Sequence, residues 1–176
     1  LEIPGYEPRA LQAMALGFAV GTRGADHNRS GAYELDLSEE VDRFRGDSRA
    51  AELATRTENQ AALMDSLILC KFLRGVFEDF QGEAAELLRA VTGWEVRASE
   101  LDAVAERIIA LRKAYNIREG WQPEDDTLPQ RWFEDEVQWG AYAGESIDKE
   151  AFDSLLSRFY ALSNLDPEGR PDVPFR

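Results

Sequence analysis

The chain of 176 residues is poor in cysteine, histidine and cationic side chains. It has one cysteine, one histidine, and 20 Lys and Arg against 34 Asp and Glu, which gives a net charge of −14. A single cysteine cannot form a disulfide within the chain, so we expect a reducing compartment, and the cytoplasm is the default. The excess of negative charge repels phosphate backbones and argues against a nucleic-acid partner.

Long apolar runs and familiar catalytic motifs are missing as well. No stretch approaches the roughly 18 apolar residues of a membrane span, and no basic, apolar leader is present, so we predict a soluble protein without a membrane partner. The sequence has no glycine-rich phosphate loop, CxxC, HExxH or nucleophile elbow. Cys70 and His27 have no recognisable third orienting group, so a thiol hydrolase is not expected.

Apolar residues recur at helical spacing, without strand-like alternation or an internal repeat, and this pattern predicts an all-α fold. We expect an irregular multi-helix domain over residues 1–176, with a split into two subdomains near 81–98 as an alternative. A polar loop is expected over 22–31, and a connection with one helical turn after Ser38 over 32–47. Helices are predicted over residues 8–21, 48–64, 69–80, 83–91, 99–115 and 130–136, and from 149 to 162.

The stretch Asn59–Arg74, NQAALMDSLILCKFLR, contains Asp65 and Cys70 among densely spaced apolar residues. This density predicts burial, and a buried carboxylate or thiol needs a partner. In a continuous helix the two side chains would lie roughly 140° apart, whereas a break near Asp65 would let both face one object. From the residues alone, Cys70 is a buried thiol or a metal ligand, and Asp65 is a helix cap or a partnered acid.

Other polar residues have simpler interpretations from the sequence. Arg23 and Arg29 are expected to form surface ion pairs. Asp125 and Asp126 are interpreted as cap or turn residues rather than metal ligands.

Four segments, in the same order, resemble the C-terminal helical region of the tungsten-containing aldehyde ferredoxin oxidoreductase family. They are similar to that family's GYDPR helix start, RGADH loop, DxxGLC pattern and GERI…FNxREG…DDxLP pattern. The matching residues are Gly5–Arg9, Arg23–His27, Asp65–Cys70 and Glu106–Pro129. Because the sequence opens on Leu1 and lacks that family's upstream motifs, we interpret it as a fragment of a longer enzyme.

The resemblance implies a role for each matched position. Cys70 would supply one thiolate to a 4Fe-4S cluster, and Asp65 would hydrogen-bond one molybdopterin of a tungsten-bis-molybdopterin, assisted by the backbone around Leu69. His27 would lie near the tungsten, to hydrogen-bond the substrate oxygen or move a proton. The implied reaction oxidises an aldehyde to a carboxylate and sends electrons through the cluster to ferredoxin. The implied partners are the N-terminal remainder of the enzyme, ferredoxin and the aldehyde.

Two departures from the family pattern support a second hypothesis. Ile68 stands where the family usually has glycine, and one cysteine cannot hold a 4Fe-4S cluster, which needs four ligands. The isolated chain is therefore expected to bind no cofactor and to turn over no substrate. The alternative is a non-catalytic helical scaffold or interaction module. It predicts that apolar side chains enclose Cys70 on all sides, whereas a sulfur open at the surface beside Asp65 would contradict it.

Overall fold

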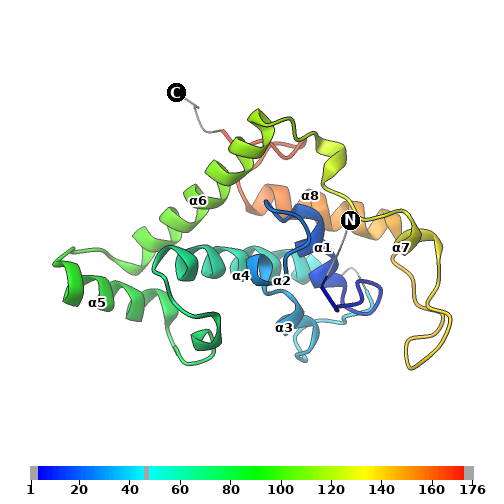
Figure 1. Ribbon diagram of the computed structural model, residues 1–176, viewed down its shortest axis with the longest axis horizontal. Coiled ribbons are helices and arrows are strands. Elements are labelled where there is room, and N and C mark those ends of the chain that lie inside the picture. The colour runs from blue at the N-terminus through cyan, green and yellow to red at the C-terminus, as the bar shows by residue number, and fades with distance from the viewer. Residues whose placement is uncertain (1–3, 46–47, 173–176) are drawn as a thin grey trace.

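The computed structural model describes residues 4–45 and 48–172, and it confirms the all-α prediction (Figure 1). In this part of the chain the backbone forms helices and no strand, apart from isolated bridges between Thr22 and Gly24 and between Leu165 and Pro171. No described helix is long and apolar enough to cross a membrane. The elements are α1 (Gln12–Val20), α2 (His27–Ser30), α3 (Tyr33–Asp36), α4 (Ser48–Ser66), η1 (Lys71–Leu73), α5 (Phe80–Thr92), α6 (Ala98–Arg118), η2 (Pro123–Asp125), α7 (Arg131–Glu134) and α8 (Lys149–Leu162).

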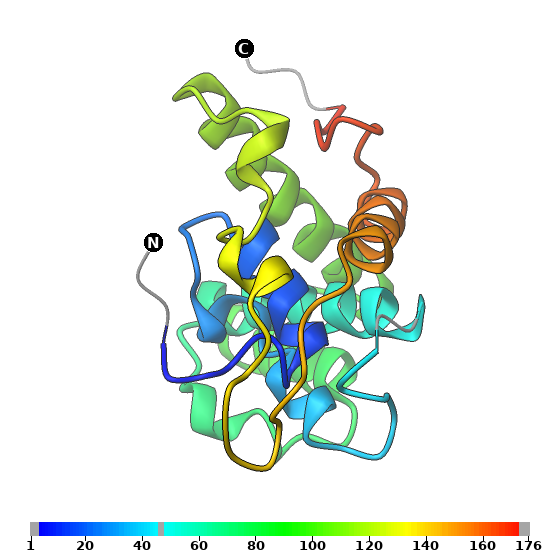
Figure 2. The same ribbon diagram turned by 90° about the vertical axis from the view of Figure 1, so that its right-hand side faces the viewer.

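Helix α1 is the centre of the larger hydrophobic cluster. All of its residues are buried, and it packs against α2, α3, α4 and α8 (Figure 2). Its first N–H groups are capped from another helix, because the Asp36 carboxylate accepts hydrogen bonds from the backbone of Ala13 (3.0 Å) and Met14 (2.8 Å). Burial raises the pKa of Asp36 to about 6, although these two hydrogen bonds oppose the shift. The helical turn expected after Ser38 therefore lies earlier, at α3, where it positions this cap.

A second hydrophobic cluster joins the end of α4 to α5 and the first half of α6. Leu63 and Met64 of α4 pack there with Phe80, Ala84 and Leu101. In Figure 1, α5 and α6 lie side by side at the left end of the molecule. Helix α4 contributes to both clusters and is the element that connects them. The division into subdomains near 81–98 stays a prediction.

Several predicted helix ends agree with the structure. Helix α1 ends before Gly21, and α5 ends at Gly93, which adopts a left-handed φ of 76°. Asp148 caps α8 by accepting a hydrogen bond from the backbone of Ala151 (2.7 Å). Helix α4 begins at Ser48 as predicted; any capping by the Ser48 side chain lies outside the described residues.

Helix α6 is longer at both ends than the sequence suggested. Its first turn is closed by Glu100, whose carboxylate accepts from the backbone N–H of Arg97 (2.9 Å), so the start lies before Ser99. The helix also continues beyond the expected end before Asn116, to Arg118.

Asp126 ties the loop after α6 to both α6 and α8. It is buried, and its carboxylate contacts Lys113 Nζ (2.5 Å), Trp121 Nε1 (2.9 Å) and the Tyr160 hydroxyl (2.7 Å). Asp126 is thus the centre of a buried ion pair, not the cap or turn residue expected from the sequence. Asp125 does match that expectation, because it accepts from the backbone of Gln122 (2.8 Å).

The predicted helix over 69–80 is wrong. Helix α4 ends in a Schellman motif: the Ile68 N–H donates to the Asp65 carbonyl (3.2 Å) and the Leu69 N–H to the Met64 carbonyl (2.8 Å). Ile68 itself adopts φ 58°, in the left-handed region. Only the short η1 follows, with Phe72 90% and Val76 67% exposed.

The prediction of a helix over 69–80 failed because it assumed that all the apolar side chains of this stretch are buried. An apolar stripe favours a helix because the helix buries it. Here Phe72 and Val76, in the middle of the stripe, face outward, and only its ends pack against the second hydrophobic cluster. The next helix, α5, starts where Asp79 caps it by accepting from the backbone of Gly82 (3.2 Å).

We expect Ile68→Gly to raise the free energy of unfolding by about 1 kcal/mol. Glycine removes the steric cost of a left-handed β-branched residue, which outweighs its own entropic cost, and a side chain that is 92% exposed gives up little burial. Urea denaturation measures the change. Ile68→Val keeps the branched side chain and should bring no gain. A less stable glycine variant would contradict this account of the turn.

Candidate functional site

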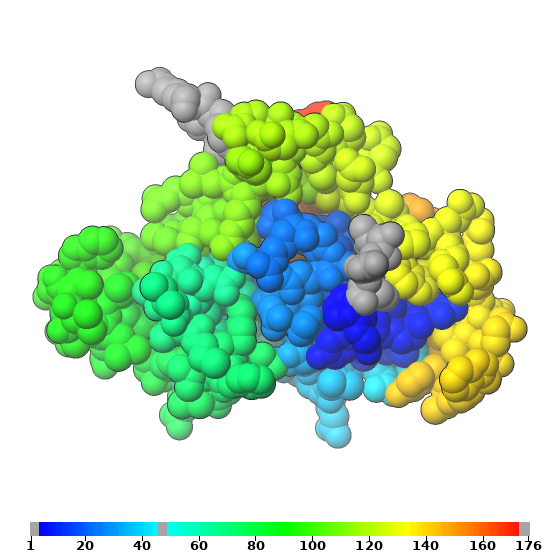
Figure 3. Space-filling model, viewed as in Figure 1, coloured from blue at the N-terminus to red at the C-terminus, as the bar shows by residue number. Residues whose placement is uncertain are grey.

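A hollow of about 550 Å³ opens where α4 ends, between the segment after α4 and the segment that carries α2 (Figure 3). We call it the Asp65 hollow. Three of the four residues selected from the sequence line it: His27, Asp65 and Cys70. The other lining residues are Tyr6, Arg23, Asn28, Tyr33, Lys71, Phe72 and Arg74. The break after α4 therefore brings Asp65 and Cys70 to one hollow, as the sequence suggested.

Asp65 is held by two cationic side chains. Its Oδ2 atom contacts Nη1 of Arg29, and its Oδ1 atom lies 3.4 Å from Nζ of Lys71. The Arg29 side chain is only 19% exposed, so the expected surface ion pair is instead a largely buried one. Arg23 does form a surface pair, with Asp26. Because a carboxylate offers about four acceptor positions, Asp65 keeps acceptor capacity toward the hollow.

Cys70 is exposed, and its thiol lies at the wall of the Asp65 hollow. The enclosure by apolar side chains that the scaffold hypothesis predicted is therefore not observed. No group of three or more His, Cys, Asp or Glu residues that could hold a metal is found in the described part of the chain. A metal or cluster bound at Cys70 would need ligands from other protein.

His27 begins α2 and belongs to an aromatic group. Asp26 caps this single helical turn by accepting from the backbone of Asn28 (2.9 Å), so the predicted loop over 22–31 contains a short helix. The His27 ring centroid lies 5.2 Å from that of Tyr6 and 6.0 Å from that of Tyr33, and the two tyrosine rings stack at 4.7 Å. These rings restrict the imidazole to an edge of the hollow.

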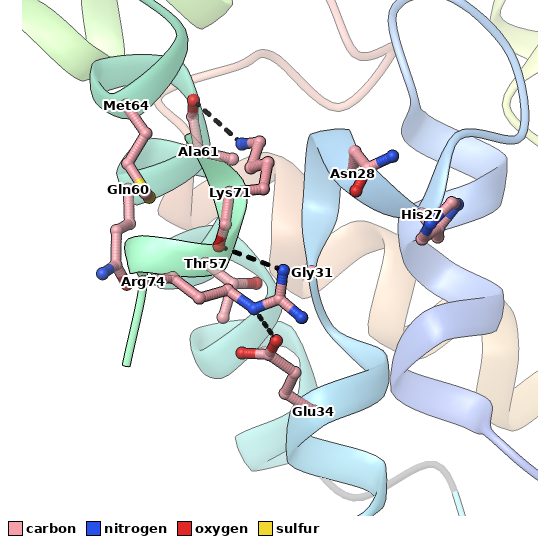
Figure 4. Close-up of a pocket in the computed structure, with 10 residues that line it drawn as sticks. All are labelled: His27, Asn28, Gly31, Glu34, Thr57, Gln60, Ala61, Met64, Lys71 and Arg74. Carbon is pink, nitrogen blue, oxygen red and sulfur yellow. Dashed lines mark hydrogen bonds and ion pairs between the residues drawn. The ribbon is translucent and has the colours of Figure 1, made fainter. Parts of the chain in front are cut away.

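The segment after Cys70 is attached to the rest of the protein by Lys71 and Arg74. Lys71 Nζ donates to the Ala61 carbonyl (3.3 Å), and Arg74 forms an ion pair with Glu34 of α3 (Figure 4). Arg74 also donates to the hydroxyl of Tyr33. Burial lowers the pKa of Lys71, while the neighbouring Asp65 carboxylate opposes that shift.

Leu69 does not line the Asp65 hollow. Its side chain packs against the second hydrophobic cluster and lines a groove along α5. Its N–H is already used in the turn that ends α4, whereas no hydrogen bond to its carbonyl is found among the described residues. Any backbone assistance from Leu69 would therefore come from the carbonyl oxygen as an acceptor.

Sequence reasoning missed Arg29, Lys71, Tyr6 and Tyr33 as parts of the site. A signal existed for three of them: Tyr6 lies within the first family-like segment, Arg29 lies two residues after the RGADH-like loop, and Lys71 directly follows Cys70. Tyr33 had no such signal, because only the fold brings it to the hollow.

The family model described as "Aldehyde ferredoxin oxidoreductase, domains 2 & 3" matches residues 1–173. The chain belongs to this family. It is 27% identical to a tungsten-containing aldehyde ferredoxin oxidoreductase of Pyrococcus furiosus over 175 residues, and 26% identical to one of Thermococcus kodakarensis. Each alignment covers 97% of this chain and 28% of the relative. The chain therefore spans little more than a quarter of the length of these relatives.

Glu58 of α4 lies buried behind the site, near the charges of Arg29, Arg112 and Lys113. Burial raises its pKa from 4.5 to about 7, although the charges of Lys113 and Arg112 oppose the shift. Between these pH values the folded protein holds more protons than the unfolded chain. The stability contributed by Glu58 is therefore complete below pH 4.5 and is lost as the pH rises toward about 7.

We expect Glu58→Gln to flatten the pH dependence of stability between about pH 4.5 and 7.5. The wild-type protein should lose up to about 3 kcal/mol more unfolding free energy across this window than the variant, because glutamine does not ionise. Urea denaturation at a series of pH values measures the difference. Glu52→Gln, an exposed change on the same helix, should leave the slope unchanged. Parallel plots of unfolding free energy against pH for the wild type and Glu58→Gln would contradict the assignment of this pH dependence to Glu58.

Proposed function

We propose that this chain is part of a tungsten-pterin aldehyde ferredoxin oxidoreductase, to which it contributes one iron-sulfur ligand and part of the pterin site. The observation that carries the proposal is the Asp65 hollow. It brings His27 of the RGADH-like loop together with Asp65 and Cys70, the two ends of the DxxGLC-like segment. The relatives supply the context, since their names describe tungsten-containing aldehyde oxidoreductases.

Cys70 fits the role of a cluster ligand because its sulfur is exposed beside an open hollow. Thiolates are the usual ligands of 4Fe-4S clusters, and three more would come from outside this chain. An exposed thiol of this kind also suits a reducing compartment, and we place the protein in the cytoplasm.

Asp65 fits the role of a pterin-binding residue because it is anchored and still has acceptor capacity. Arg29 and Lys71 fix the position of the carboxylate through two ion pairs. The pterin ring presents N–H groups, and a charged acceptor makes the stronger class of hydrogen bond with them. The Leu69 carbonyl is a second acceptor close in sequence.

His27 is the residue of this chain that we assign to proton transfer. Oxidation of an aldehyde to a carboxylate adds one oxygen atom from water and releases two electrons and three protons. When bound, the metal-pterin group and the cluster would supply the two-electron chemistry and the route of the electrons to ferredoxin. An imidazole can both accept and donate a proton near neutral pH, and the tyrosine rings hold His27 where it can serve the substrate oxygen.

The surface around Cys70 supports a protein partner at this end of the hollow. Ile68, Phe72 and Val76 flank the cysteine with large exposed apolar side chains, at 92%, 90% and 67% exposure. Apolar groups gathered in this way mark a contact site more often than free surface. We propose that the N-terminal remainder of the enzyme covers this segment and supplies the missing cluster ligands. The exposure of Cys70 argues against the scaffold alternative.

We expect Cys70→Ser, made in the natural protein that carries this chain, to abolish binding of the cluster and so remove about four iron atoms per chain. Serine keeps the shape of the side chain but replaces the thiolate. Iron and tungsten analysis, with visible absorption, measures the loss, and circular dichroism checks the fold.

Leu37→Ala is the control for this experiment, because it truncates an exposed apolar side chain that does not line the Asp65 hollow. It should keep the iron content of the wild type. Equal iron content in the Cys70→Ser and wild-type proteins would refute the assignment of Cys70.

A further inference from the structure

A second hollow, of about 410 Å³, lies between the loop before α2 and the last turns of α6. We call it the Arg112 hollow. It shares Arg23 with the Asp65 hollow, and its remaining wall comes from Thr22, Arg29, Leu111, Arg112, Tyr115 and Asn116. None of these positions was selected from the sequence as a binding residue.

Hydrogen bonds and ion pairs fix the shape of the Arg112 hollow. The Asn116 side-chain amide donates to the Thr22 carbonyl (2.6 Å), which attaches the loop to α6. Arg23 is turned toward Asp26 by an ion pair, and Arg29 is held by Asp65. Two of the three arginines are thus positioned by contacts outside the hollow, so the site is preorganised.

The charge around the two hollows is opposite to that of the whole chain. Five Lys and Arg side chains line them, together with a single carboxylate, that of Asp65, although the chain carries a net charge of −14. A local excess of cations in a concave surface concentrates small anions there.

Arg112 is the cation of this group that forms no ion pair within the described residues, whereas Arg23, Arg29, Lys71 and Arg74 each form one. In the part of the chain that the structure describes, no carboxylate lies within ion-pair distance of Arg112. Burial lowers the pKa of Arg112, and the neighbouring charge of Arg29 lowers it further, while the charges of Asp65 and Glu58 oppose the shift. The Nε atom of Arg29 is also buried without a hydrogen-bond partner among the described residues. A negative ligand in the hollow would offset the repulsion between Arg112 and Arg29.

We propose that the Arg112 hollow binds a small oxyanion, a phosphate or carboxylate group, with Arg112 as the principal contact and Arg29 as the second. A guanidinium offers planar pairs of N–H donors that match these groups, and Asp65 occupies only Nη1 of Arg29. The overall negative charge excludes polyanions such as nucleic acids, whereas a small ion can enter the local positive field. This inference does not rest on the proposed cofactor roles, because every residue it uses lies in this chain.

The test is isothermal titration of inorganic phosphate, and separately of acetate, into the purified protein that carries this chain, at constant ionic strength. We expect saturable binding of at least one of the two ions, and the one that binds identifies the class of oxyanion. Arg112→Gln should weaken that binding at least about tenfold, because it removes charge-assisted hydrogen bonds.

Arg107→Gln is the matched control, since it makes the same charge change at an exposed position of the same helix. It should alter binding less than about twofold. Equal weakening by the two changes would show general electrostatics and overturn the proposal, as would the absence of saturable binding by both ions. Arg112→Lys, which keeps the charge but not the paired donors, should lie between the wild type and Arg112→Gln even if the glutamine variant folds poorly. Iron content in the Cys70→Ser variant tests the proposed function separately.

Discussion

The end of α4 is the constraint on which the rest of the site depends. The Schellman motif at Ile68 stops the helix one turn after Met64 and turns the chain toward α2. If the helix continued, Asp65 and Cys70 would face directions roughly 140° apart and could not line one hollow. A left-handed isoleucine costs free energy, so the surrounding contacts must hold the turn. Leu69, packed against the second cluster, and Lys71, bonded to Ala61 and Asp65, are the contacts that do so.

The loop over residues 22–31 faces this turn and combines several structural roles. Within a few residues it supplies a surface ion pair at Arg23, a helix cap at Asp26, an aromatic-packed imidazole at His27 and the counter-ion of Asp65 at Arg29. Because Asn116 of α6 anchors the same loop, the position of His27 depends on a helix far along the chain. The buried pair of Lys113 and Asp126 fixes that helix in turn against α8. Breaking such a pair is costly, because the remaining charge would stay buried.

How much of this could be read from the sequence depends on the range of each interaction. Local signals succeeded: Gly21 and Gly93 mark helix ends, and Asp148 starts α8. The apolar stripe over 69–80 failed because periodicity reports burial only when a partner surface exists, and Phe72 and Val76 have none within the described chain. The roles of Asp36 and Asp126 could not be predicted from the sequence, for a related reason. Their partners are backbone or side-chain groups of other elements, which no spacing along the sequence encodes.

The Asp65 and Arg112 hollows also show what a net charge leaves out. A total of −14 describes the field at long range, where the contributions of many scattered charges add, and such a field repels polyanions. At the scale of a small ligand, screening by salt leaves only the nearest few charges effective. The side chains that line the two hollows are four arginines and one lysine against the single carboxylate of Asp65. In the proposed site, an acidic surface that repels polyanions therefore surrounds a cationic hollow that a small oxyanion can enter.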